Sequence, residues 1–295
     1  MSEFSRVGFI GLGVMGEPIC RNLAQKGGVP VLGCDKQAEP LARLAGHGVQ
    51  TADVARIMAE CDLVFLSLPS GEIVDQLARQ PGGLLDHLRN GQIVVDTSTS
   101  PVDLTRRLHD DFAARGAHFV DAPVARTRAA AEAGTLAVMV GAEPALFERI
   151  RPYIATYASD ITLCGGIGSG QVLKILNNMV LFETVLALSE ARAIARRAGV
   201  DADVLFDTLS KGSADSFALR NHGLKAIVPG DFPEKAFPVD YAHKDLRYAL
   251  ELAEQTGVDA RGARTVAHWF DQAHALGHGQ RYFPVISRVI DTDAT

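Results

Sequence analysis

The sequence has few of the residues that build disulfide frameworks, metal sites or membrane anchors. Only four of its 295 residues are cysteines and none forms a C-x-x-C pair, so we expect buried, reduced thiols in a cytoplasmic protein. No histidine pair stands with carboxylates at metal-ligand spacing, so no metal site is predicted. No apolar run reaches the roughly 18 residues of a transmembrane helix, and neither a signal peptide nor a membrane contact is expected.

The charge balance argues against a nucleic-acid partner. Lysine and arginine number 29 against 35 aspartate and glutamate residues, which gives a formal net charge of −6. The basic residues are scattered, whereas nucleic-acid-binding proteins gather them into a patch or stripe. The content of apolar residues (47%) and of charged residues (22%) is that of an ordinary globular protein, and the length favours two domains or one large one.

Short apolar runs alternate with helix-length segments over the first 165 residues. Most of these runs are rich in β-branched residues and continuously apolar, which is typical of strands buried on both faces of a parallel sheet. The alternation predicts an α/β domain of the Rossmann type over residues 1–165, with a doubly wound parallel sheet. Ligands of such sheets bind outside the carboxyl ends of the strands. The predicted strands are 6–11, 29–35, 62–69, 92–99, 117–124, 136–142 and, more weakly, 161–166.

The pattern changes after residue 165. A long helix is predicted over about 170–198, apolar on nearly all sides in its first part, with Gly199 at its end. We expect this helix to lie between the two domains or in a subunit contact, and we assign residues 166–295 to an all-α substrate and oligomerisation domain. The other predicted helices are 201–211, 217–228, 240–257, 260–277 and 283–291.

A glycine fingerprint directly follows the first predicted strand. The stretch GFIGLGVMG has the spacing G-x-G-x-x-G. Its first glycine allows a tight turn, its second lets the backbone approach a pyrophosphate, and its third lets helix and strand pack closely. A helix N-terminus with free N–H groups follows. The residues predicted to hold the dinucleotide here are Gly11, Leu12, Gly13, Val14, Met15 and Gly16.

Asp35 ends the second predicted strand, 19 residues after Gly16. A carboxylate at this place hydrogen-bonds the adenosine ribose 2′-hydroxyl and repels a 2′-phosphate, so NAD is favoured over NADP. The neighbouring Lys36 could tolerate that phosphate, and Asp35 could instead be only a strand-end turn residue. The loops that end two further strands are predicted to pass under the ribose and nicotinamide, through Leu68, Pro69 and Thr99.

Lys174 and Asn178 stand four residues apart near the start of the long helix and so share one face. A lysine in an apolar helix predicts a partly desolvated ammonium with a depressed pKa, able to donate a proton to a carbonyl oxygen as hydride arrives. The alternative is a lysine whose head group reaches solvent. Asn178 is predicted to bind the substrate. Asn177 points about 100° away around the helix and is predicted to serve the same pocket or, alternatively, a helix contact.

Two arginines follow the predicted strand HFVDAPV, in the loop DAPVARTR. Arg126 either faces the substrate cleft and binds an acid group, or is a solvated loop residue; Arg128 is expected to face solvent. Thr127 would add a hydroxyl to an anion site.

Four motifs stand in order along the chain: GLGVMG, DAPV followed by AAAEAGTL, G-x-G-x-x-x-K-x-x-x-N, and HKDL-x-x-A-x-x-x-A. Together they resemble the β-hydroxyacid dehydrogenase family, which includes 3-hydroxyisobutyrate dehydrogenase and tartronate semialdehyde reductase. The resemblance covers about residues 6–290. It implies a Rossmann domain, an interdomain helix and an all-α domain in a homodimer or homotetramer. It also implies Lys174 as the acid/base, Asn178 as a substrate ligand and Lys244 as a cofactor-side residue.

One loop departs from the family pattern. Where the family has D-x-P-V-S-G-G, this chain has Ala125, Arg126 and Thr127 in the last three places. That variant resembles sulfolactaldehyde reductase, whose loop arginine binds a sulfonate, so a small anionic substrate with a carboxylate or a sulfonate is expected.

The expected function is an NAD-dependent oxidoreductase acting on a small β-hydroxyacid or semialdehyde. The alternatives are an NADPH-dependent semialdehyde or glyoxylate reductase, an imine reductase, and a dinucleotide-binding protein without catalysis. Imine reductases of this fold usually lack the lysine, so Lys174 speaks against them.

Overall fold

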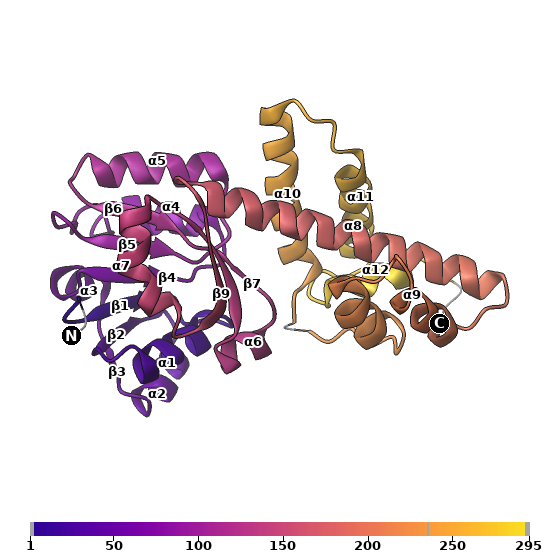
Figure 1. The fold of residues 1–295 in the computed structure, drawn as a ribbon, viewed down its shortest axis with the longest axis horizontal. Coiled ribbons are helices and arrows are strands. Elements are labelled where there is room, and N and C mark those ends of the chain that lie inside the picture. The colour runs from indigo at the N-terminus through magenta and orange to yellow at the C-terminus, as the bar shows by residue number, and fades with distance from the viewer. Residues whose placement is uncertain (1–2, 235, 293–295) are drawn as a thin grey trace. The chain divides into compact units, whose positions relative to one another are not determined.

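The computed structural model describes residues 3–234 and 236–292, and the chain divides into two compact units, Met1–Lys174 and Ile175–Thr295 (Figure 1). The first unit is built on a nine-stranded sheet in the order β3-β2-β1-β4-β5-β6-β8-β7, with β9 paired to β8. Six of these strands, from β3 to β6 in that order, are parallel. The strands are β1 (Val7–Ile10), β2 (Val31–Cys34), β3 (Val49–Thr51), β4 (Leu63–Leu66), β5 (Ile93–Asp96), β6 (His118–Asp121), β7 (Val124–Ala125), β8 (Leu136–Gly141) and β9 (Ala158–Gly165).

Helices cover both faces of this sheet and form a separate core on each. One core joins the sheet to α1 (Gly16–Lys26), α2 (Ala38–Ala45) and α7 (Pro144–Ile154). The other joins it to α3 (Val54–Glu60), α4 (Gly71–Arg79) and α5 (Val102–Ala113). Every residue of β1, β4 and β5 is buried, which explains why these strands are continuously apolar in the sequence. The Rossmann-type fold class is confirmed.

The sheet differs from the predicted one at both edges. The prediction missed β3, which is three residues long and has a single buried residue, Val49, so it carries no apolar run. The expected all-parallel sheet is wrong at the other edge, where β8 runs antiparallel to β6 and β7. Because β7 continues the direction of β6, the strand pair β7–β8 extends past the carboxyl ends of the parallel strands and carries the 126–135 segment with it. That segment includes the short helix α6 (Arg128–Ala133).

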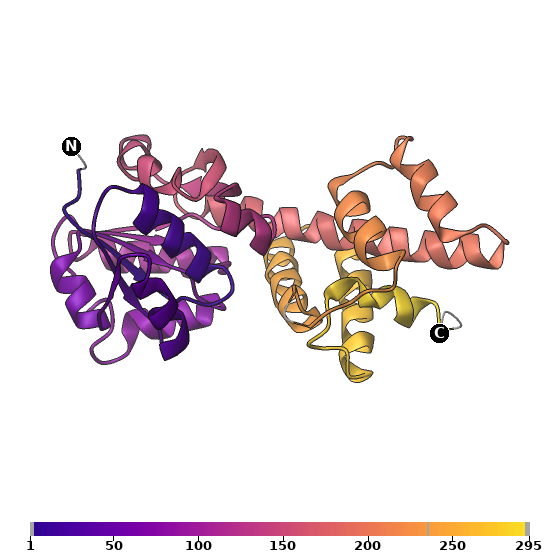
Figure 2. The same ribbon diagram turned by 90° about the horizontal axis from the view of Figure 1, so that it is seen from below.

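Among the residues that the structure describes, the second unit is helical apart from two isolated backbone bridges, one between Glu234 and Arg281 and one between Pro238 and Tyr282. Its core packs Phe182 of the long helix α8 (Ser169–Arg197) against Phe270 and Phe283. Figure 2 shows the ribbon of its helices from a second side. The other helical segments are α9 (Ala202–Ser210), the π-helix η1 (Leu219–Ile227), α10 (Val239–Thr256), α11 (Arg261–Ala275), the 3₁₀ turn η2 (Phe283–Val285) and α12 (Ile286–Ile290).

The predicted long helix is present as α8, which crosses the boundary between the two units at Lys174 and Ile175. By length and composition alone, α8 is apolar enough to cross a membrane. One such helix is weak support for a membrane span, because core helices of soluble proteins have the same properties. The absence of a membrane contact stays a prediction.

Candidate active site

The glycine loop has the geometry of a dinucleotide cradle. Gly11 has a φ of +93°, and a Cβ there would lie 2.3 Å from the Ser67 carbonyl oxygen. At Gly16 a Cβ would lie 2.0 Å from the Gly11 carbonyl oxygen, so only glycine lets α1 start this close to β1. Gly13 differs, because a Cβ there would meet no atom within 4 Å. The open space at Gly13 is what the approach of a pyrophosphate requires, so these residues fit a dinucleotide.

The other residues of the glycine loop differ in their exposure to solvent. Val14 is 48% exposed, Met15 is half-buried and Leu12 is buried. No side chain caps the N-terminus of α1, so its first backbone N–H groups have no side-chain acceptor within the described residues. Such a terminus binds phosphate well.

Asp35 is tied to the glycine loop. Its carboxylate accepts hydrogen bonds from the backbone N–H of Leu12 at 2.5 Å and of Gln37 at 2.8 Å. The carboxylate therefore lies beside the fingerprint, as a ribose-binding group must, and it also holds the loop in shape. Lys36, the next residue, is exposed.

Two further loops follow β4 and β5 and are joined to each other. The backbone N–H of Leu68 donates to the Ser98 hydroxyl at 2.8 Å. Pro69 is exposed, whereas Thr99 is only 8% exposed. Since β1, β4 and β5 are parallel neighbours, all three loops leave the same edge of the sheet, where the sequence placed the cofactor.

Sequence reasoning missed a buried polar network behind these loops. Asp96 accepts from the Ser98 N–H at 2.9 Å and from the Ser100 hydroxyl at 3.1 Å. Burial raises the pKa of Asp96 to about 6, although the hydrogen bonds from the two serines oppose the rise. Asp121, at the end of β6, accepts from the first amides of α8. Burial likewise raises the pKa of Asp121 to about 6, against the backbone hydrogen bonds. The sequence signal was a carboxylate directly after each apolar run.

Lys174 lies in the second turn of α8 and is the last residue of the first unit. It is 9% exposed, so its ammonium group belongs to a largely desolvated side chain rather than to an open surface. Asn178 follows one turn later on the same helix. Whether Lys174 transfers a proton stays a prediction.

Arg126 is the one residue other than glycine with a positive φ (85°) among those the structure describes. Its guanidinium donates to the Thr135 carbonyl at 2.6 Å and to the Ser159 hydroxyl at 2.9 Å, and it pairs with Asp160 at 2.8 Å. Hydrogen bonding from Ser159, and then from Arg126, lowers the pKa of Asp160. The arginine is thus held at the start of β9 by neighbours of its own unit, and its role in substrate binding stays a prediction.

The residues around Arg126 are exposed. Thr127 is the residue before α6, and its hydroxyl makes no capping hydrogen bond to that helix. Arg128 is exposed and pairs with Glu132, one turn along α6.

The second unit brings three predicted site residues together around Asp245: Asn177, Asn178 and Lys244. Asn178 is buried, and its amide donates to Asp245 at 2.7 Å. The Lys244 ammonium lies 2.9 Å from the same carboxylate, and 4.3 Å from the centre of the Tyr241 ring. The exposed Asn177 donates to the Asn178 side-chain oxygen at 3.2 Å. Asp245, which was not among the predicted site residues, therefore links Asn178 and Lys244.

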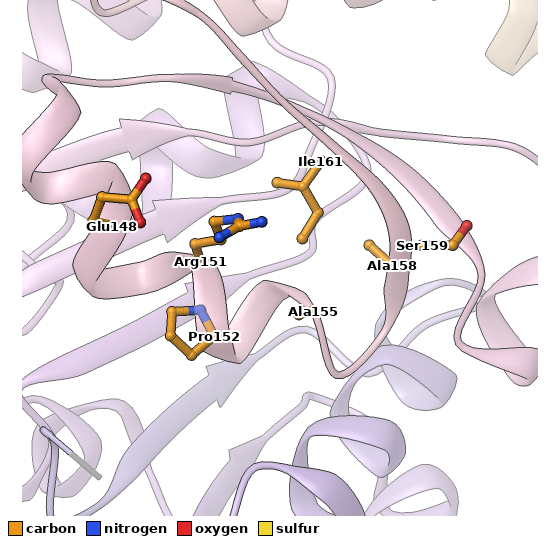
Figure 3. Close-up of a pocket in the computed structure, with 7 residues that line it drawn as sticks. All are labelled: Glu148, Arg151, Pro152, Ala155, Ala158, Ser159 and Ile161. Carbon is orange, nitrogen blue, oxygen red and sulfur yellow. The ribbon is translucent and has the colours of Figure 1, made fainter.

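A cavity of about 410 Å³ lies elsewhere in the first unit, between α7 and the start of β9 (Figure 3). Ser159, one of its lining residues, accepts a hydrogen bond from Arg126 at 2.9 Å. Its lining residues are Glu148, Arg151, Pro152, Ala155, Ala158, Ser159 and Ile161. Over residues 3–234 and 236–292, no group of three or more His, Cys, Asp or Glu side chains could hold a metal ion.

Two family models match the chain almost end to end. Residues 6–166 match the NAD-binding domain of 6-phosphogluconate dehydrogenase, and residues 168–290 match the NAD-binding domain of NADP-dependent 3-hydroxyisobutyrate dehydrogenase. The chain belongs to the β-hydroxyacid dehydrogenase family. It is therefore an NAD(P)-dependent oxidoreductase with a dinucleotide-binding domain, and its Rossmann and helical parts are those that the resemblance implied.

Individual relatives agree with this membership. The chain is 33% identical over 290 residues to 2-(hydroxymethyl)glutarate dehydrogenase of Eubacterium barkeri, covering 98% of this chain and 96% of the relative. It is 29% identical over 289 residues to 3-sulfolactaldehyde reductase of Escherichia coli, with the same two coverages. The solved 3-hydroxyisobutyrate dehydrogenase of Mycobacterium tuberculosis with L-serine has a TM-score of 0.89 and 30% identity, covering 98% of this chain and 99% of that one.

Proposed function

We propose that this β-hydroxyacid dehydrogenase moves a hydride between NAD and the carbonyl or hydroxyl carbon of a small acid-bearing substrate. The substrate class is a β-hydroxyacid or its semialdehyde, such as 3-hydroxyisobutyrate, tartronate semialdehyde or sulfolactaldehyde. The observation that carries the proposal is the open space at Gly13, at the strand edge where Asp35 and the 96–101 loop also stand.

In the proposed reaction, the nicotinamide transfers the hydride and Lys174 transfers the proton. The bound nicotinamide supplies or takes the hydride. Lys174 gives a proton to the developing alkoxide oxygen during reduction, and takes it back during oxidation. A largely buried ammonium suits this role, because a charge in a water-poor site stabilises the alkoxide more strongly than a solvated charge does.

Substrate selection is proposed to rest on Arg126 and Thr127, with Asn177 and Asn178 as further ligands. A guanidinium binds carboxylate and sulfonate oxygens by charge-assisted hydrogen bonds. In the structure the Arg126 guanidinium has Asp160 as its anion, so a substrate acid group would have to compete with that carboxylate. Both side chains are substantially exposed, which keeps this ion pair weak and exchangeable.

NAD is proposed over NADP because the Asp35 carboxylate stands beside the fingerprint. Lys244, linked to Asp245, is proposed as a cofactor-side cation. The proposed binding partner is a small anionic substrate, and neither a nucleic acid nor a membrane is proposed as a partner. A cytoplasmic location and a homodimer or homotetramer remain predictions.

The experiment is to follow oxidation of NADH and, separately, of NADPH by the purified protein across a panel of aldehydes. The panel contains succinate semialdehyde, tartronate semialdehyde and glyoxylate as carboxylates, sulfolactaldehyde as a sulfonate, glyceraldehyde 3-phosphate as a phosphate, and propanal without an acid group. We expect turnover of one acid class with NADH and little of propanal. Equal rates with propanal would refute an anion-selective site, faster turnover with NADPH would refute the cofactor assignment, and no turnover of any panel member would refute the proposed substrate class.

A further inference from the structure

Resting on the proton-transfer role proposed above for Lys174, we propose that Gln171 and Asp121 position that lysine by fastening the start of α8. Gln171 fastens it to the 96–101 loop, and Asp121 fastens it to the end of β6. Neither residue touches the reacting atoms in this proposal. Each acts through Lys174, one turn further along the helix.

Asp121 fixes where the helix starts. One carboxylate oxygen accepts from the Gly168 N–H at 2.7 Å and the other from the Gln171 N–H at 2.9 Å. These amides belong to the helix end, where backbone N–H groups have no partner within the helix. A Cβ at Gly170 would lie 2.3 Å from the Met139 carbonyl oxygen and 2.8 Å from the Asp121 carboxylate, so the helix start is pressed against β8 and this carboxylate.

Gln171 fixes the rotation of the helix about its own axis. Its side chain is fully buried, its oxygen accepts from the Ser100 N–H at 3.0 Å, and its amide nitrogen donates to the Ser98 carbonyl at 2.8 Å. One planar amide therefore spans both backbone neighbours of Thr99, the residue predicted to lie under the nicotinamide. The Asp96 carboxylate accepts further hydrogen bonds from the same two serines.

These contacts reach Lys174 through helix geometry. Lys174 is three residues after Gln171, so the two side chains point in directions about 60° apart and lie about 4.5 Å apart along the helix axis. Turning the helix by about 10° would move a group about 6 Å from the axis by about 1 Å. A shift of that size can lower the rate of a reaction about 100-fold.

The competing explanation is that Gln171 contributes only to stability, as any buried glutamine with satisfied hydrogen bonds does. The chain offers a matched control for this. Gln92 is 1% exposed, and its amide donates to the carbonyl oxygens of Met58 at 2.9 Å and Cys61 at 2.7 Å. Gln92 precedes β5 and so lies at the amino end of that strand, whereas Ser98 and Ser100 follow its carboxyl end.

The experiment compares Gln171→Met with Gln92→Met, which each replace a buried amide by an apolar side chain of similar length. For the panel aldehyde that the wild type reduces fastest, kcat, KM, the NADH Kd from fluorescence, and Tm are measured. We expect Gln171→Met to lower kcat about 10- to 100-fold with a far smaller change in NADH Kd, and Gln92→Met to keep kcat within about twofold. Gln171→Asn, one methylene shorter and still polar, should fall between wild type and Gln171→Met, and keeps the test available if Gln171→Met does not fold.

Equal losses of kcat in the two methionine variants, or a Gln171 loss confined to NADH affinity, would overturn the positioning role. Lys174→Met, measured in parallel, separates this failure from that of the proposed function. If Lys174→Met abolishes turnover while Gln171→Met behaves like Gln92→Met, only the positioning inference is wrong. If Lys174→Met turns over like wild type, the proposed function and the inference are both wrong.

Discussion

Replacing Gly13 by alanine should separate cofactor binding from folding. Gly13 is exposed, it does not adopt the left-handed backbone conformation, and a Cβ there would meet no atom within 4 Å. The added methyl group therefore strains nothing in the protein itself. Because alanine restricts the unfolded chain, we expect the free energy of unfolding to stay constant or to rise by up to about 1 kcal/mol.

The same methyl group would occupy the space that a pyrophosphate must enter. If it pushes the phosphate away from even one backbone N–H, the lost charge-assisted hydrogen bond is worth about 1.5–3 kcal/mol, which corresponds to a roughly 10- to 150-fold weaker NADH Kd. Gly16→Ala is the matched contrast, because its Cβ would lie 2.0 Å from the Gly11 carbonyl oxygen. Such overpacking should destabilise the protein by about 1–3 kcal/mol or more.

The assay measures NADH affinity by nicotinamide fluorescence and stability by urea unfolding for wild type, Gly13→Ala and Gly16→Ala. We expect Gly13→Ala to lose affinity without losing stability, and Gly16→Ala to lose stability. Wild-type NADH affinity in Gly13→Ala would show that the dinucleotide does not approach this backbone, and the placement of the cofactor would be wrong.

Three further outcomes can be measured on single variants. Asp35→Asn should reduce the ratio of kcat/KM for NADH over NADPH, since it removes the charge that repels a 2′-phosphate; an unchanged ratio would contradict this role. Arg126→Ala should raise KM for the preferred acid-bearing aldehyde about 10-fold or more and leave propanal unaffected, as steady-state kinetics would show; equal effects on both substrates would make Arg126 a surface residue. Burial, with the nearby Lys225 charge, lowers the pKa of His222 to about 4, so its neutral form stabilises the fold fully above pH 6.5 and this contribution is lost as the pH falls toward 4. The free energy of unfolding of wild type should accordingly drop by about 3 kcal/mol more than that of His222→Gln between about pH 7 and pH 4, and parallel curves would refute it.

The sequence was most informative where local chemistry and fold agree. The fingerprint Gly11, Gly13 and Gly16 could be placed because each glycine meets a separate steric requirement that the structure shows. The buried strands could be found because burial on both faces leaves a continuous apolar run. The strand β3 and the antiparallel turn at β8 could not be found in this way, because pairing partners are set by tertiary contacts rather than by local pattern.

Part of the candidate site was out of reach for the same reason. Gln171 and Asp121 are 50 residues apart, and Asn178 and Asp245 are 67 apart, so their pairings depend on the folded chain. Arg126 could be singled out as unusual after a strand, but its pairing with Asp160 follows from β8 and β9 lying parallel side by side. Candidate site residues could therefore be chosen from the sequence by their chemistry, but their hydrogen-bond and ion-pair partners could not.

Lys174 is proposed to carry the proton in an NAD-dependent reduction. The most direct measurement is single-turnover NADH oxidation by Lys174→Met and wild type, with the fastest panel aldehyde and with enzyme in excess of NADH. Removing a general acid should slow hydride transfer by about 10²- to 10⁴-fold while the NADH Kd stays near that of wild type. A Lys174→Met variant that transfers hydride at the wild-type rate would contradict the claim.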